Sequence, residues 1–132
     1  LFICLLVVVV TIQCFTVTFL NKCPQAYPVF ANSNLVCNEL AEGESCDDTI
    51  ILRPATTYRF ASPGYTNATF ISTLLSGIKY EVETAATRLD MPISVTPDNA
   101  NYPTISCLTA NCARSDRTQG FATTNFLVSL CP

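Results

Sequence analysis

The chain has 132 residues, a net charge of −3 at neutral pH, eight cysteines and no histidine. The lack of histidine excludes mechanisms of the Ser-His-Asp and Cys-His kind, so acid–base chemistry would have to use carboxylates. The 7 lysine and arginine residues are scattered and form no basic patch in the sequence, which argues against nucleic acid or an anionic membrane as a partner.

The chain begins with the run LFICLLVVVVTIQC, which is almost wholly apolar and carries no charge. This profile is typical of the core of a signal peptide, and the run is too short to span a bilayer comfortably. We therefore predict a partial signal peptide over residues 1–16 and a single folded domain over residues 17–132. The mature protein is expected to be secreted, extracellular and monomeric, with no membrane association after cleavage.

Removing Cys4 and Cys14 with the leader leaves six of the eight cysteines: Cys23, Cys37, Cys46, Cys107, Cys112 and Cys131. An even set in a small secreted domain predicts three disulfides. A zinc site is the competing use of cysteine, but the chain has neither histidine nor a CxxC pattern. We predict no metal site and no cofactor.

Short β-rich runs separated by turn residues recur through the rest of the chain. They are residues 17–20, 27–30, 49–52, 57–60, 68–75, 78–83, 92–96 and 125–130. The best helical candidate, ETAATRL at 83–89, is barely two turns long, so a loop or a short helical turn is expected there. The pattern predicts an all-β fold, an antiparallel β-sandwich or flattened barrel.

Several segments occur in an order that carries further information. VTFLNKCPQAYPVFA opens the predicted domain, GESCDDTIILRPATTYRF and NATFISTLL follow, and NFLVSLCP ends the chain. Between them, KYEVETAATRLDMPISVTPDNANYPTISCLTANC contains a Tyr-x-Val strand, a Met-Pro turn, a Ser-x-Thr-Pro strand end and two cysteines separated by four residues. Together these segments resemble the thaumatin-like protein family. The resemblance implies a disulfide-stapled thaumatin-like β domain over most of the mature chain.

The chain also departs from that family. Ordinary members carry a disulfide-rich second lobe after the paired cysteines, whereas only residues 113–124 separate Cys112 from the last predicted strand. The resemblance is therefore to a reduced member that lacks this lobe.

The family also implies a disulfide pattern. Its first cysteine pairs with its last, which implies a Cys23–Cys131 disulfide here. The cysteines at 107 and 112 match family cysteines whose partners lie in the missing lobe, so we favour their pairing with each other, and Cys37 with Cys46. Pairing of Cys37 or Cys46 with either of the other two stays open, since sequence does not determine connectivity.

Full-length thaumatin-like proteins have a cleft of one arginine and several acidic residues that binds, and in some members hydrolyses, β-1,3-glucans. Glu81 stands where the family's Tyr-Asp-Val strand has a cleft aspartate, and Arg59 lies near the cleft arginine. Thr69 stands where the family has a cleft glutamate, so that carboxylate is missing. The resemblance thus implies a cleft that is at best half present.

Glycoside hydrolysis needs two carboxyl groups at a controlled separation. Strand alternation places Glu83 on the same face as Glu81, with Tyr80 and Val82 directed to the core. Glu81 and Glu83 are therefore the candidate catalytic pair. The alternative interpretation, a solvated strand face with two ordinary carboxylates, favours a protein that is not an enzyme.

The remaining candidate residues concern sugars. Arg59, Glu81, Tyr65 and Tyr102 are candidate binding residues, because exposed tyrosine rings stack on sugar rings. Asn67 begins the sequence Asn-Ala-Thr, an N-glycosylation sequon, and predicts a glycoprotein.

We predict a secreted, pathogenesis-related type of protein that acts in defence or at a cell wall by binding β-glucan, another polysaccharide or a partner. The alternatives are a β-1,3-glucan hydrolase and a small cysteine-rich effector that binds a protein.

Overall fold

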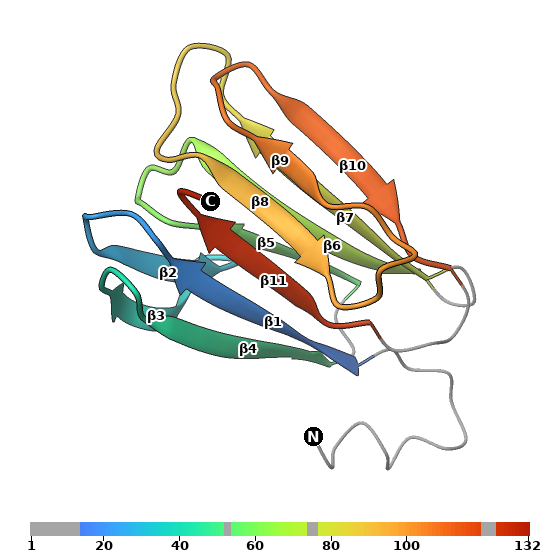
Figure 1. The fold of residues 1–132 in the computed structure, drawn as a ribbon. Coiled ribbons are helices and arrows are strands. Elements are labelled where there is room, and N and C mark those ends of the chain that lie inside the picture. The colour runs from blue at the N-terminus through green and yellow to red at the C-terminus, as the bar shows by residue number, and fades with distance from the viewer. Residues whose placement is uncertain (1–13, 52–53, 74–76, 120–123) are drawn as a thin grey trace.

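The computed structural model describes residues 14–51, 54–73, 77–119 and 124–132. Residues 1–13 of the predicted leader, Cys4 among them, lie outside this part of the chain, as do the ends of two predicted strands at residues 52 and 74–75. The described residues form eleven β-strands in two sheets and contain no helix (Figure 1). Accordingly, no helix among them is long and apolar enough to cross a membrane.

The first sheet has five strands in the order β4-β1-β11-β8-β9. Their bounds are β1 Cys14–Asn21, β4 Ser45–Ile51, β8 Ile93–Pro97, β9 Ile105–Cys107 and β11 Phe126–Leu130. β1 and β11 run parallel, with Val17 opposite Phe126, and the other neighbours are antiparallel. The first and last strands therefore lie side by side inside this sheet (Figure 1).

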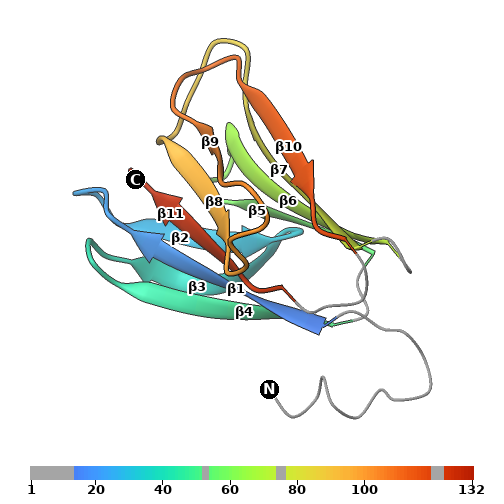
Figure 2. The ribbon, with the colours of Figure 1, turned by 45° about the vertical axis from the view of Figure 1, so that its right-hand side comes forward.

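The second sheet has six strands in the order β10-β7-β6-β5-β2-β3, all antiparallel. Their bounds are β2 Tyr27–Ala31, β3 Asn34–Leu40, β5 Ala55–Arg59, β6 Thr66–Thr73, β7 Gly77–Thr84 and β10 Ala113–Arg117. The two sheets form two layers, with β3 beside β4 at one edge and β9 beside β10 at the other (Figure 2). The predicted all-β sandwich is confirmed.

Aromatic side chains fill the space between the sheets. The ring of Phe126 on β11 lies 4.9 Å from that of Phe70 on β6 and 5.2 Å from that of Tyr80 on β7, measured between centroids. Phe19 on β1 packs against Tyr58 on β5 at 4.7 Å. All five side chains are buried, and burial of one such ring stabilises the fold by roughly 2–3 kcal/mol. These contacts across the layers hold the two sheets together.

The structure places the start of the fold earlier than the predicted boundary at residue 17. Strand β1 begins at Cys14, which lies opposite Ile51 of β4. Phe15 is 1% exposed and packs against Phe126 at 5.6 Å. No described cysteine is free, Cys14 included. A mature chain with this core intact therefore retains Cys14 and Phe15, whereas the signal peptide itself stays a prediction.

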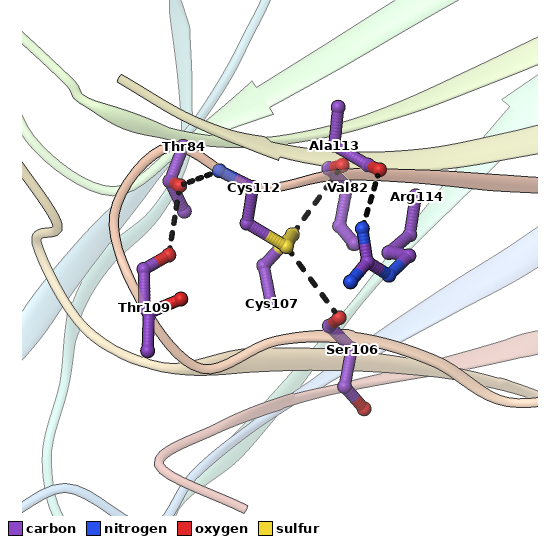
Figure 3. Close-up of a disulfide and its surroundings, with 8 residues drawn as sticks. All are labelled: Val82, Thr84, Ser106, Cys107, Thr109, Cys112, Ala113 and Arg114. Atoms are coloured by element: carbon purple, nitrogen blue, oxygen red, sulfur yellow. Dashed lines mark hydrogen bonds between the residues drawn. A yellow bond between two sulfur atoms is a disulfide. The ribbon is translucent and has the colours of Figure 1, made fainter. Parts of the chain in front are cut away.

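Three disulfides lie among the described residues: Cys23–Cys131, Cys37–Cys46 and Cys107–Cys112. They are the three pairs that the sequence analysis favoured: the first from the family resemblance, and the other two as pairings of cysteines close together in the chain. The first joins the segments that follow β1 and β11. The other two each join one sheet to the other, because β3 and β4 are edge strands of different sheets and so are β9 and β10. Both open edges of the sandwich are thus covalently closed (Figure 3 shows the Cys107–Cys112 pair).

A buried asparagine shapes the turn after β1. The Nδ2 of Asn21 donates to the carbonyl oxygens of Gln25 and Leu40, both at 2.7 Å, and its Oδ1 accepts a hydrogen bond from the backbone N–H of Cys23 at 2.8 Å. Asn21 is fully buried, so each of these bonds satisfies a group that water does not reach. This is the physical role of the asparagine in the opening segment VTFLNKCPQAYPVFA.

Two glycines adopt positive φ angles, +83° at Gly43 and +93° at Gly77. A Cβ added at Gly77 would lie 2.1 Å from the carbonyl oxygen of Thr118, whereas one added at Gly43 meets nothing within 4 Å. The close approach at Gly77 is needed because Ile78 and Thr118 exchange hydrogen bonds at 2.9 Å. Gly77 is therefore required both for its backbone angle and for its lack of a side chain.

Tyr80 crosses the core to reach a backbone group on the other side. Its hydroxyl donates to the carbonyl oxygen of Pro103 at 2.6 Å. Burial, assisted by the nearby negative charge of Asp116 and by Tyr102, raises the pKa of Tyr80 to about 12. The phenol therefore stays neutral at physiological pH and has a structural role.

Candidate binding face

The outward side chains of β7 belong to the outer face of the six-stranded sheet. Ile78, Tyr80 and Val82 are buried, while Glu81 is half-buried and Glu83 is exposed. The two glutamates therefore share the outer face, with Tyr80 and Val82 in the core, as strand alternation predicted.

Five side chains line up across this face from strand to strand. Glu83 lies opposite Asn67 of β6, and Asn67 lies opposite Arg59 of β5. Arg59 in turn lies opposite Phe30 of β2, which lies opposite Leu35 of β3. We call these five residues the outer row. Two strand spacings separate β7 from β5, so the backbones at Glu83 and Arg59 are about 10 Å apart.

Next to the outer row, the following outward residues of β7, β6 and β5 are already engaged with one another. The carboxylate of Glu81 lies 3.3 Å from the ammonium of Lys79 on the same strand. Opposite Glu81 on β6 is Thr69, whose Oγ1 is 3.1 Å from the Oγ1 of Thr57. Glu81 is therefore already paired with a cation, and a hydroxyl pair occupies the space where a second acid would face it.

This geometry does not favour glycoside hydrolysis. A general acid is kept protonated by burial or by a close like charge. Glu81 is instead next to a cation, and Glu83 is exposed on an open sheet face. The two candidate catalytic residues thus share one face, but neither lies in the buried or like-charged surroundings that a general acid needs.

A hollow of about 340 Å³ adjoins the outer row at Arg59. It is lined by the segment 61–64, which follows β5, and by Phe30, Ser33 and Arg59. A Cβ added at Gly64 would lie 3.2 Å from the Cβ and 3.4 Å from the Cδ of Arg59, so the aliphatic stem of this arginine packs directly on the glycine backbone. Phe30, Ser33 and the hollow were not predicted from the sequence, because the lining comes from two segments that only the β2–β5 pairing brings together.

Two charges on the outer row have no charged partner. Within the described part of the chain, Lys79 and Glu81 form the single ion pair. Arg59 and Glu83 therefore lie more than 4 Å from any oppositely charged group there, although Arg59 is half-buried. Across the same residues, no three His, Cys, Asp or Glu side chains are grouped so as to hold a metal ion.

The two tyrosines predicted to bind sugar, Tyr65 and Tyr102, are not residues of the outer row, and each is in contact with other groups of the protein. The guanidinium of Arg88 lies 4.6 Å from the ring centre of Tyr65 and donates to its hydroxyl at 3.1 Å. The hydroxyl of Tyr102 accepts from the backbone N–H of Gln119 at 3.1 Å and donates to its carbonyl at 3.3 Å. Tyr65 directly precedes β6 and Tyr102 lies between β8 and β9, so neither is one of the five residues of the outer row.

Comparison with known proteins bears on the fold. No protein-family model and no curated protein matches the chain, so the thaumatin-like resemblance stays a prediction. Among solved structures, the protein elicitor MoHrip2 from Magnaporthe oryzae is similar, with a TM-score of 0.63 and 12% sequence identity over 89% of this chain and 99% of that chain. At this identity the similarity shows a shared fold alone.

Proposed function

We propose that this chain is a small extracellular effector-type protein that acts by binding a partner protein, without catalysis. Three disulfides are typical of proteins that fold in an oxidising compartment. The chain shares its fold with MoHrip2, a protein elicitor, and the proposed class of function is consistent with this.

The observation that carries the proposal is that two charged residues of the outer row, Arg59 and Glu83, form no ion pair within the described part of the chain. Arg59 and Glu83 project from β5 and β7, which flank β6 in one sheet, at a separation set by the backbone. Opposite charges fixed in this way select a partner with the complementary charges in the reverse order. A preformed sheet face also loses little conformational entropy on binding.

The same face gives less support to a neutral polysaccharide. Neutral β-glucans are bound largely by stacking on several exposed aromatic rings, whereas the five residues of the outer row include one aromatic residue, Phe30. Tyr58 and Tyr80 are buried, and Tyr65 and Tyr102 are engaged with other groups. A hydrolase is supported still less, given the surroundings of Glu81. The effector alternative is therefore favoured over the wall-polysaccharide one.

The proposal also conflicts with the predicted glycan. Asn67 lies in the outer row between Glu83 and Arg59, and a glycan there would cover both charges. Binding through the row requires unmodified Asn67, and the intact mass of the secreted protein measures this directly.

Binding to protoplasts tests the function, because these cells expose surface proteins without a wall. We expect saturable binding of the labelled protein that is lost after the cells are treated with trypsin. The double variant Arg59→Glu with Glu83→Lys keeps the net charge and should weaken binding by roughly tenfold or more. The matched control, Arg114→Glu with Glu39→Lys, changes exposed charges off the row and should bind as the unmodified protein does.

Two results would contradict the proposal. Retention on insoluble β-1,3-glucan that the outer-row variant leaves unchanged would indicate polysaccharide binding. Release of reducing sugar from that glucan, abolished by Glu81→Gln in a folded protein, would indicate a hydrolase. Circular dichroism of each variant establishes that the fold is retained.

A further inference from the structure

We infer that the hollow beside Arg59 binds a carboxylate attached to an apolar group, as presented by the C-terminal residue of a partner peptide. This inference rests on the proposed function, since it names the chemistry that one end of the outer row recognises.

Arg59 is held in place but has no carboxylate partner among the described residues. Its stem is held against Gly64 and it is half-buried, yet no carboxylate of the described chain lies within 4 Å of it. A guanidinium offers a planar pair of donors that matches the two oxygens of a carboxylate. In partly desolvated surroundings this pairing is stronger than at an open surface. An anion that pairs with Arg59 would therefore come from outside the described chain.

The rest of the lining combines apolar surface with hydroxyl groups. Phe30, Ala61 and Pro63 contribute apolar surface, and the hydroxyl-bearing residues are Ser33 and Ser62. A volume of about 340 Å³ is at the small end of ligand pockets. Such a hollow suits one apolar side chain next to one anionic group.

Two kinds of ligand could supply the carboxylate, a sugar acid or the C-terminal residue of a peptide. A sugar acid carries hydroxyl groups on most of its carbons, and each needs a polar partner when it is buried. Two serines cannot satisfy them, whereas a C-terminal residue presents its carboxylate beside an apolar side chain. The peptide chain can then continue along the outer row, where about three extended residues span the roughly 10 Å from Arg59 to Glu83. Glu83 would meet a basic side chain of that peptide.

A titration followed by ¹⁵N-correlated NMR tests the site with small probes. N-acetyl-phenylalanine carries the carboxylate, N-acetyl-phenylalanine amide is the neutral control, and galacturonate represents a sugar acid. We expect the acid to shift the backbone signals of Ser33, Arg59 and Gly64, with an affinity at least tenfold above that of the amide and of galacturonate.

Variants connect the shifts to the arginine. Arg59→Gln should abolish the preference for the acid over the amide, while Arg59→Lys keeps the charge and should retain part of it. Arg114→Gln, on exposed strand β10, is the control and should bind the acid as the unmodified protein does. The spectrum of each variant without probe reports whether the fold is intact.

Several outcomes overturn the inference. Equal shifts with acid and amide, an acid preference that survives Arg59→Gln, or tighter binding of galacturonate would each do so. If none of the three probes binds in the hollow while protoplast binding still depends on Arg59 and Glu83, the inference fails and the proposed function stands. If the acid binds as expected but protoplasts do not bind the protein, the carboxylate site stands and the proposed function fails.

Discussion

Replacement of both Cys23 and Cys131 by alanine is expected to destabilise the protein more than loss of either other disulfide. The paired cysteines are 108 residues apart, compared with 9 for Cys37–Cys46 and 5 for Cys107–Cys112. In the loop-entropy model the stabilisation grows with the logarithm of loop length, which gives about 5, about 3 and about 2 kcal/mol respectively.

The structure supplies a competing expectation. β1 and β11 are already paired over five residues, so the Cys23–Cys131 bridge adds little to the native arrangement and acts on the unfolded chain. The Cys107–Cys112 bridge instead joins β9 to the residue directly before β10, at the edge where the two sheets meet. If edge closure mattered more than chain entropy, the Cys107–Cys112 variant would be the less stable one.

Urea unfolding of the double-alanine variants under non-reducing conditions separates the two mechanisms. Cys23 and Cys107 are both fully buried, so packing losses are similar and largely cancel in the comparison. A loss of about 5 kcal/mol is comparable with the whole stability of a small domain, so a stabilising osmolyte should be present in all samples. A Cys23–Cys131 variant that loses no more free energy of unfolding than the Cys107–Cys112 variant would refute the entropic argument.

Three further predictions concern the core, a turn and pH. Phe126→Ala should lower the free energy of unfolding by about 3–5 kcal/mol, whereas Leu127→Ala, at a partly exposed neighbour, should cost under about 1 kcal/mol in the same urea assay. Gly77→Ala and Gly43→Ala share the strain of a positive φ, but the backbone clash at Gly77 should add roughly 1–3 kcal/mol; equal costs would contradict the structure. Because the pKa of Tyr80 is about 12 in the folded state and about 10 when unfolded, its contribution to stability is complete below about pH 10 and is lost as the pH rises towards 12. Thermal melts across this range should show a shallower decline for Tyr80→Phe.

The strongly alternating segments were predictable because alternation is a local property of the chain. IKYEVE places Ile78, Tyr80 and Val82 on one face, and this pattern predicts both a strand and the outward direction of Glu81 and Glu83. Strands without that signal were missed. β10 reads Ala-Arg-Ser-Asp-Arg and is exposed throughout, and β9 has only three residues. β3, Asn34–Leu40, was missed as well. All three are edge strands: β10 buries no side chain and depends on its backbone pairing with β7, whereas β9 also buries Ile105 and Cys107.

The sequence by itself determined that the chain forms short strands, which residues of those strands enter the core, and that its cysteines pair. The tertiary structure decided which strands are neighbours, including the parallel pair β1 and β11, and therefore which outward side chains share a row. Arg59 and Glu83 are far apart in the chain, and nothing local to either residue specifies the other. Their alignment follows from the register of β5, β6 and β7, which is set when the inward faces of these strands pack against the opposite sheet.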